Sequence, residues 1–121
     1  MLFRCDSNRG GVFGPWLTRA VTSSHFDHVA LIMRFGDTIK DLYILEAVGE
    51  RGVRLLSWLS LRAELYPGGF FEKIVTRKLL YEMTPEKLND LDKFRKNCVG
   101  LSYGLSPRKI LFNSPSEPDL L

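Results

Sequence analysis

Two titratable residues, His28 and Glu46, stand among apolar neighbours in two β-rich stretches of the sequence, 24–34 and 42–48. A carboxylate beside an imidazole orients the ring and stabilises it while it takes and returns a proton. His28 is therefore a candidate general base, and Glu46 is its candidate orienting group. The alternative is a histidine that satisfies its polar atoms locally and has no chemical role.

The polar stretch 36–41 between these runs predicts an antiparallel hairpin. Strand side chains alternate between the two faces, so the register decides whether His28 and Glu46 meet. With a tight turn at 36–38, His28 falls directly opposite Glu46. A loop that is longer by an even number of residues leaves them diagonal neighbours on one face, whereas a slip by one residue separates them.

The remaining elements follow from apolar periodicity and from turn residues. We expect strands at 1–5, 53–56 and 70–79, the last flanking the hairpin, and helices at 15–21, 57–65 and 85–98. Ser57 is the expected cap of the second helix. The fold class predicted is therefore α+β, with an antiparallel sheet of about four to five strands packed by helices.

The helix at 85–98 has the clearest signals. Thr84 is a good N-cap, and Pro85 suits the first helical position. Its apolar positions recur on one face, at Leu88, Leu91, Phe94 and Cys98. This spacing predicts that Cys98 is buried, and a thiol among apolar side chains has a raised pKa and little nucleophilicity.

A chain of 121 residues with 45% hydrophobic residues is long enough for one domain with a single core. We assign that domain to 1–112 and expect 113–121 to be a linker or tail, because it is rich in Ser, Pro and acidic residues. The sequence has no apolar run of the length that crosses a bilayer and no secretory signal. These features predict a cytoplasmic protein with no transmembrane segment.

The charge pattern does not favour a nucleic-acid partner. The net charge is only +3, and a nucleic-acid binder usually carries a dense Lys/Arg stripe. The candidate cations alternate with acids and lack interleaved aromatic stacking positions. They are Arg51, Arg54, Lys73, Arg77 and Lys78.

The cysteines and histidines do not predict a metal centre or a cofactor. Cys5 and Cys98 are too few for a zinc site of four cysteines or a disulfide-rich scaffold. His25 and His28 are three apart, which places them on opposite faces of a strand. We therefore expect reduced thiols and no metal.

Several short motifs resemble a known family. They are Phe3-Arg4, a helix with Trp16 and Leu17, Asp27-His28-Val29-Ala30-Leu31, Leu45-Glu46-Ala47, Gly52-Val53 and Gly100-Leu101-Ser102-Tyr103-Gly104-Leu105. Together they resemble the circularly permuted NlpC-type branch of the papain-like fold, the YiiX-like proteins, which are distantly similar to lecithin:retinol acyltransferase. The likeness runs from about Leu2 to Phe112.

The resemblance implies a cysteine hydrolase or acyltransferase that acts on an amide, ester or thioester bond of a peptide, amide or acyl-lipid substrate. His28 matches the histidine that acts as general base toward a cysteine thiol. Glu46 matches the polar residue that orients the imidazole, and Tyr103 matches a tyrosine that lies near the nucleophile.

The sequence departs from the family at the nucleophile, because no cysteine follows Tyr103. Three explanations remain open: the thiol belongs to a C-terminal helix missing from a truncated chain, the protein is a non-catalytic lipid- or peptide-binding module, or Cys98 is displaced into the site. We favour the first, because His28 and Glu46 are both in place, and we expect little turnover from this chain alone. Apolar contacts of a binding module would come from Trp16, Phe26, Trp58 and Tyr66.

Overall fold

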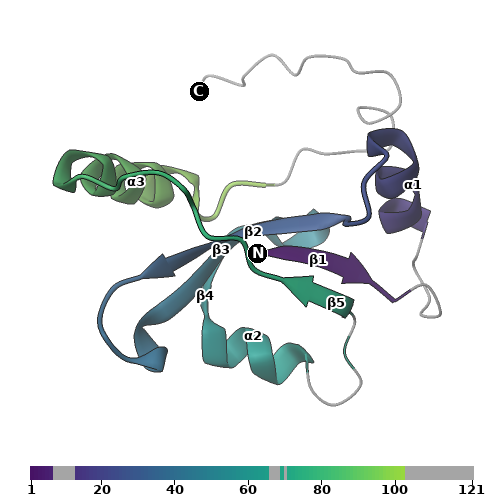
Figure 1. Ribbon diagram of the computed structural model, residues 1–121, viewed down its shortest axis with the longest axis horizontal. Helices are drawn as coiled ribbons and strands as arrows, with labels where there is room; N and C mark the ends of the chain where they lie inside the picture. The colour runs from purple at the N-terminus through teal and green to yellow at the C-terminus, as the bar shows by residue number, and fades with distance from the viewer. Residues whose placement is uncertain (7–12, 66–68, 70, 103–121) are drawn as a thin grey trace.

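The computed structural model describes residues 1–6, 13–65, 69 and 71–102. In this part of the chain five strands form an antiparallel sheet with the order β4-β3-β2-β1-β5, and helices accompany it (Figure 1). The strands are β1 (Leu2–Cys5), β2 (His28–Arg34), β3 (Leu42–Val48), β4 (Gly52–Ser57) and β5 (Phe71–Val75), and the helices are α1 (Phe13–Thr22), α2 (Trp58–Leu65) and α3 (Pro85–Cys98). The predicted α+β class is confirmed.

The β2–β3 hairpin forms, but its loop is longer than the tight turn expected. Phe35 N donates to Asp41 O at 3.0 Å, and a short 3₁₀ turn, η1 (Ile39–Asp41), lies in the loop. The Asp41 carboxylate accepts from Thr38 N at 2.9 Å and from Thr38 Oγ1 at 2.7 Å, which stabilises the wider loop. As a result Ala30, rather than His28, pairs directly with Glu46. The shift is even, so His28 and Glu46 remain diagonal neighbours on one face.

The first strand lies between the hairpin and the last strand. Phe3 pairs with His28 on one side and with Ile74 on the other. The expectation that the last strand flanks the hairpin was wrong, because β1 occupies that position. The residue types explain the order: Phe3 is fully buried, whereas β5 exposes Glu72 and Lys73, and charged side chains suit an edge strand.

One face of the sheet holds the core, and α2 covers it. Phe3, Ala30 and Ile44 pack there with Leu61 from α2. The helix begins where Ser57 Oγ accepts from Ser60 N at 3.1 Å, which confirms the predicted cap. Figure 1 shows α2 on one side of the sheet and α3 on the other.

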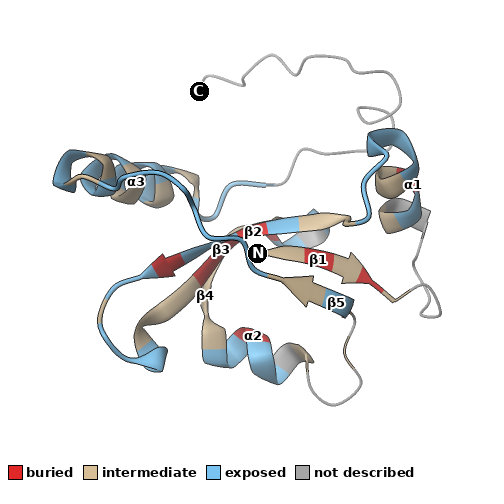
Figure 2. Ribbon diagram, in the orientation of Figure 1, coloured by how far each residue is buried: buried red, intermediate tan, exposed pale blue. Residues whose placement is uncertain are grey.

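The α3 helix has the predicted bounds but not the predicted burial. Thr84 Oγ1 accepts from Lys87 N at 3.4 Å, as expected of the cap. Leu88 and Phe94 are 52% and 60% exposed, and Cys98 is half-buried. Figure 2 shows α3 in the colours of exposed and intermediate residues, and none of its residues is buried. The prediction of a buried apolar stripe was wrong for the described residues, because α2 already covers the core face of the sheet.

The chain after α3 is joined to the sheet at the outer edge of β4. Val53 N donates to Leu101 O and Gly100 N donates to Val53 O, both at 2.8 Å. Among the described residues no helix has both the length and the apolar character needed to cross a membrane. The linker or tail predicted at 113–121 lies outside the described residues.

Candidate functional site

His28 and Glu46 meet across the sheet. His28 Nε2 lies 2.8 Å from Glu46 Oε2, and the two side chains keep 19% and 3% of their surface exposed. The imidazole therefore reaches solvent while its carboxylate partner is buried. The two residues lie together on one face of the sheet, as the sequence pattern predicted for an even loop length.

Arg54 is a third member of the site, and sequence reasoning missed this role. It pairs directly with Glu46 in the β3–β4 register, and its Nε and Nη2 lie 2.7 Å and 2.6 Å from Glu46 Oε1. A strand that begins at 53, as expected from the sequence, would pair Val48 with Val53 and put Arg54 on the opposite face; in the structure Val48 pairs with Gly52, which brings Arg54 onto the face of Glu46.

Hydrogen bonds and the charge of Arg54 keep Glu46 ionised although it is buried. Burial alone raises the pKa of this carboxyl, but hydrogen bonds from His28 and Arg54 and the charge of Arg54 outweigh it, so the pKa lies below its ordinary range. An ionised carboxylate only accepts hydrogen bonds, so His28 Nε2 carries a proton toward it. In neutral His28 the lone pair is therefore on Nδ1, which has no hydrogen-bond partner among the described residues.

Asp27, the residue before His28, fixes the start of β2. Its carboxylate accepts from Cys5 N at 3.1 and 3.2 Å and binds the Arg19 guanidinium of α1. Asp27 N also donates to Phe3 O at 3.0 Å. These bonds tie α1, β1 and β2 together and so determine where the His28 side chain lies.

Two aromatic rings pack against the imidazole. The Phe3 ring is 5.2 Å from it between centroids, and the Phe71 ring is 6.2 Å away at an interplanar angle of 7°. Both rings come from strands other than that of His28, so the imidazole plane is restrained by β1 and β5. Such packing limits rotation of the ring and favours a single orientation toward Glu46.

The two described cysteines differ in their surroundings. Cys5 is buried, and burial together with the hydrogen bond and charge of Asp27 raises its pKa to about 12. Cys98 Sγ donates to Arg95 O at 3.6 Å within its own helix. The Cys5 thiol therefore stays protonated at neutral pH, which makes it a poor nucleophile.

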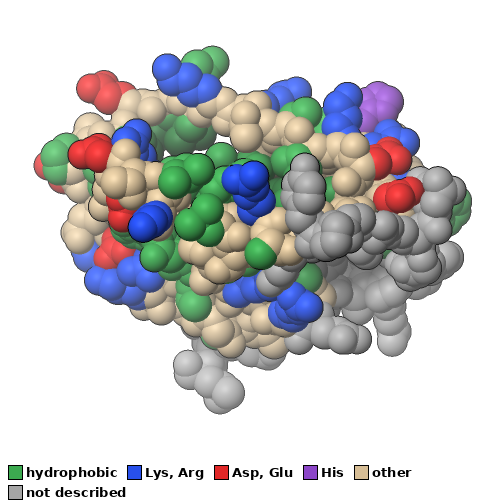
Figure 3. All heavy atoms as spheres, turned by 90° about the horizontal axis from the view of Figure 1, so that it is seen from below, with side chains coloured by type: hydrophobic (Ala, Val, Ile, Leu, Met, Phe, Trp, Pro, Cys, Tyr) green, Lys and Arg blue, Asp and Glu red, His purple; other side chains and the backbone are tan. Residues whose placement is uncertain are grey.

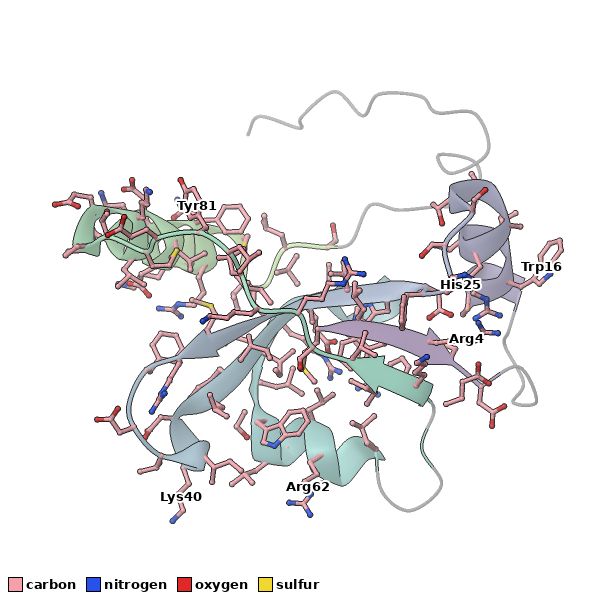
Figure 4. All side chains as sticks on the ribbon, in the orientation of Figure 1. Arg4, Trp16, His25, Lys40, Arg62 and Tyr81 are labelled. Carbon is pink, nitrogen blue, oxygen red and sulfur yellow. The ribbon has the colours of Figure 1, made fainter. Side chains whose placement is uncertain are left out.

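The aromatic residues predicted to line a binding site lie in different places. Trp16 is 55% exposed and projects from α1 away from the rest of the fold (Figure 4). Trp58 packs against the core, and Phe26 is half-buried. The predicted site residue Tyr103 and the predicted contact Tyr66 lie outside the described residues.

In the described part of the chain no cluster of His, Cys, Asp or Glu could hold a metal ion. Figure 3 shows Lys and Arg side chains scattered among hydrophobic and acidic ones on the face that it displays, rather than gathered in a stripe. The absence of a nucleic-acid partner stays a prediction from the charge pattern.

The arrangement that results is a partly exposed base, a buried acceptor and a guanidinium, each from a neighbouring strand. It is suited to moving a proton at Nδ1 of His28. No protein-family model matches this sequence, and searches of curated proteins and of solved structures give no match either.

Proposed function

We propose that this chain carries the base of a cysteine-dependent hydrolase or acyltransferase site that acts on an amide, ester or thioester carbonyl. The observation that supports this most is the 2.8 Å contact between His28 Nε2 and Glu46 Oε2 on an imidazole that is still partly exposed. The resemblance to the permuted papain-like branch points to the same chemistry. Peptides, amides and acyl lipids are the substrate classes that it implies.

In this mechanism Nδ1 of His28 takes the proton of a thiol, and the thiolate attacks the substrate carbonyl carbon. Glu46 stabilises the imidazolium that forms. The imidazolium then gives its proton to the leaving amine, alcohol or thiol as the carbon–heteroatom bond breaks and leaves a thioester. Water or an acceptor molecule, deprotonated by His28, releases the acyl group and restores the thiol.

The nucleophile in this proposal comes from outside the described residues. Cys5 is buried with a pKa of about 12, and Cys98 is engaged within α3. The resemblance assigns the thiol to a helix that follows Tyr103, and Tyr103 itself to the lining of the site. In the proposal this chain turns over little substrate alone and acts as part of a longer cytoplasmic protein, in which the reduced state of Cys5 and Cys98 is the normal one.

The test is labelling by a thiol-reactive acyl probe, applied to this chain and to any longer product of the same coding sequence. We expect labelling of the longer form alone, and a loss of about a hundredfold or more in its rate when His28→Ala removes the base. His25→Ala is the matched control, because His25 is exposed and precedes the strand. Labelling at the same rate without His28 would overturn the proposal, and His28-dependent labelling at Cys98 would assign the nucleophile to α3.

One observation favours a binding module instead. Val29 and Leu31, on the face of β2 opposite to His28, are 65% and 38% exposed. Exposed apolar side chains on a sheet are typical of surfaces that bind apolar partners. Binding of an acylated peptide that Val29→Ser weakens, together with no labelling of any form, would support the module over the enzyme.

A further inference from the structure

We propose that Arg54 is a positioning residue for the base: it holds one carboxylate oxygen of Glu46, directs the other toward His28, and prevents the imidazole from retaining its proton too strongly. This inference rests on the proposed function, in which His28 must both accept and release a proton. It concerns a residue whose role no motif of the sequence suggested.

The first step is geometric. Two of the donor nitrogens of Arg54 meet Oε1 of Glu46, at 2.7 Å from Nε and 2.6 Å from Nη2, whereas His28 Nε2 meets Oε2 at 2.8 Å. The two oxygens therefore have separate partners. A carboxylate held at one oxygen by two donors from a planar guanidinium has little freedom to rotate, so its second oxygen stays directed at the ring.

The second step is electrostatic. A buried carboxylate whose only partner is an imidazole strongly favours the protonated ring, because an uncompensated buried charge is unfavourable. Arg54 stays charged at every relevant pH and supplies that compensation itself. With Arg54 present the three groups have no net charge when His28 is neutral and a charge of +1 when it is protonated. His28 therefore gives up its proton more readily, and its protonated form leaves a net positive charge near the expected thiolate.

Among the described residues, the other groups near the imidazole do not supply this compensation. Phe3 and Phe71, which pack against the ring from β1 and β5, are uncharged. The buried Asp27 carboxylate binds Arg19, and the Met1 ammonium donates to Ala30 O at 2.7 Å. These neighbours are the same in every variant used below, so they cancel in the comparison.

The experiment is an NMR titration of the two histidines, which give one signal set each because the chain contains only His25 and His28. Arg54→Met is expected to raise the proton affinity of His28 about tenfold, since it removes a cation from a coupled site. Arg54→Lys should restore part of the wild-type proton affinity. Glu46→Gln should lower the proton affinity of His28, because it removes the negative charge that stabilises the protonated ring. Arg62→Met, an exposed arginine that projects from α2 away from the sheet, is the matched control (Figure 4).

A merely structural role gives a different result. If Arg54→Met only loosens the fold, His28 converges on the proton affinity of the exposed His25, and the inference fails. It also fails if His28 titrates as in the wild type. Should Arg54→Met not fold, Glu46→Gln is compared with Glu46→Gln/Arg54→Met. Because Arg54 acts through Glu46, its removal in this background should change the proton affinity of His28 by less than about threefold, and a tenfold rise there would overturn the inference.

The titration needs no turnover, so it is independent of the proposed function. A raised proton affinity without probe labelling in any form would support the role of Arg54 and reject the hydrolase. If the longer form is labelled, Arg54→Met should move the pH at which labelling reaches half its plateau rate upward by about one pH unit, because the neutral ring is the active form. Labelling with an unchanged pH profile would reject the role of Arg54 and leave the hydrolase in place.

Discussion

At the scale of single residues, the burial of Glu46 determines how the site responds to mutation. Its side chain is 3% exposed and binds both His28 and Arg54. Glu46→Gln removes the charge that both partners contact, so we expect a loss of about 2 kcal/mol in the free energy of unfolding, measured by chemical denaturation. Asp37→Asn is the matched control, because Asp37 also pairs with an arginine but is fully exposed.

Exposed ion pairs contribute little, so the control should change the free energy of unfolding by less than about 0.5 kcal/mol. Equal losses in the two variants would contradict the view that burial gives the Glu46 pair its importance.

The lowered pKa of Glu46 predicts a specific acid sensitivity. A carboxyl with a lower pKa in the folded state adds stability above its unfolded pKa of about 4.3, and that stability is lost as the pH falls through the folded pKa. The difference in unfolding free energy between the wild type and Glu46→Gln should therefore shrink as the pH falls below about 4. Denaturant titrations at a series of acid pH values measure it. A difference that stays constant down to pH 2 would show that the pKa of Glu46 is not lowered in the way described.

Cys5 and Cys98 should react very differently with an alkylating reagent. Because burial raises the pKa of Cys5 to about 12, its thiolate fraction at pH 8 is on the order of a thousandfold below that of an ordinary thiol. Iodoacetamide should modify the half-buried Cys98 first and reach Cys5 only in denaturant. Peptide mass spectrometry after timed labelling distinguishes the sites, and rapid modification of Cys5 in the native protein would contradict its protected state.

At the scale of the elements, the sequence predicted the type of each described helix and strand better than its surroundings. The periodicity of the hairpin strands placed His28 and Glu46 on one face, because alternation is a local property. The exact pairing depended on the η1 loop, where the Asp41 carboxylate binds Thr38, and no apolar pattern encodes that contact. The predicted pair therefore formed, but diagonally.

Predictions that depended on a neighbouring element were less accurate. The spacing of Leu88 and Phe94 correctly gave an amphipathic α3, but burial of that stripe required a surface that the described residues do not supply. Arg54 was missed for a related reason, since its partner belongs to another strand and only the β3–β4 register brings them together. The helices and strands could be predicted from local patterns, whereas the residues that each side chain contacts depend on the tertiary structure.

Packing of α2 against the core face should matter for the site, because the same face carries His28 and Glu46. Leu61 is 3% exposed within the cluster of Phe3, Ala30 and Ile44, whereas Leu59 on the same helix is 40% exposed. Leu61→Ala should lower the free energy of unfolding by about 3 kcal/mol, because it removes buried methyl groups and leaves a cavity. Leu59→Ala should lower it by less than about 1 kcal/mol. Chemical denaturation tests this pair, and similar losses would show that α2 is not anchored through Leu61.

At the scale of the whole molecule, the site depends on segments far apart in the sequence. Phe3 from β1 and Phe71 from β5 pack on the ring of His28, and Arg54 from β4 reaches it through Glu46. No two neighbouring elements hold all of these contacts, so the imidazole is in place only when the full sheet is assembled. We expect the site to form cooperatively with the fold rather than before it.

The last connection of this assembly is the one between β4 and the chain after α3, and Gly52 allows it. Gly52 has φ +67°, and a Cβ there would lie 2.3 Å from Leu101 O, the acceptor of the bond from Val53 N. Gly100 has φ +93°, but a Cβ there would meet nothing within 4 Å. Gly100→Ala therefore carries only the backbone strain of a positive φ, about 1 kcal/mol, whereas Gly52→Ala adds a clash with backbone and should lose about 3 kcal/mol. Hydrogen exchange at the Val53 amide measures this connection. Exchange should accelerate in Gly52→Ala, where the amide loses its acceptor, and stay slow in Gly100→Ala. Equal exchange rates in the two variants would mean that the hydrogen bond to Leu101 does not stabilise this edge of the sheet.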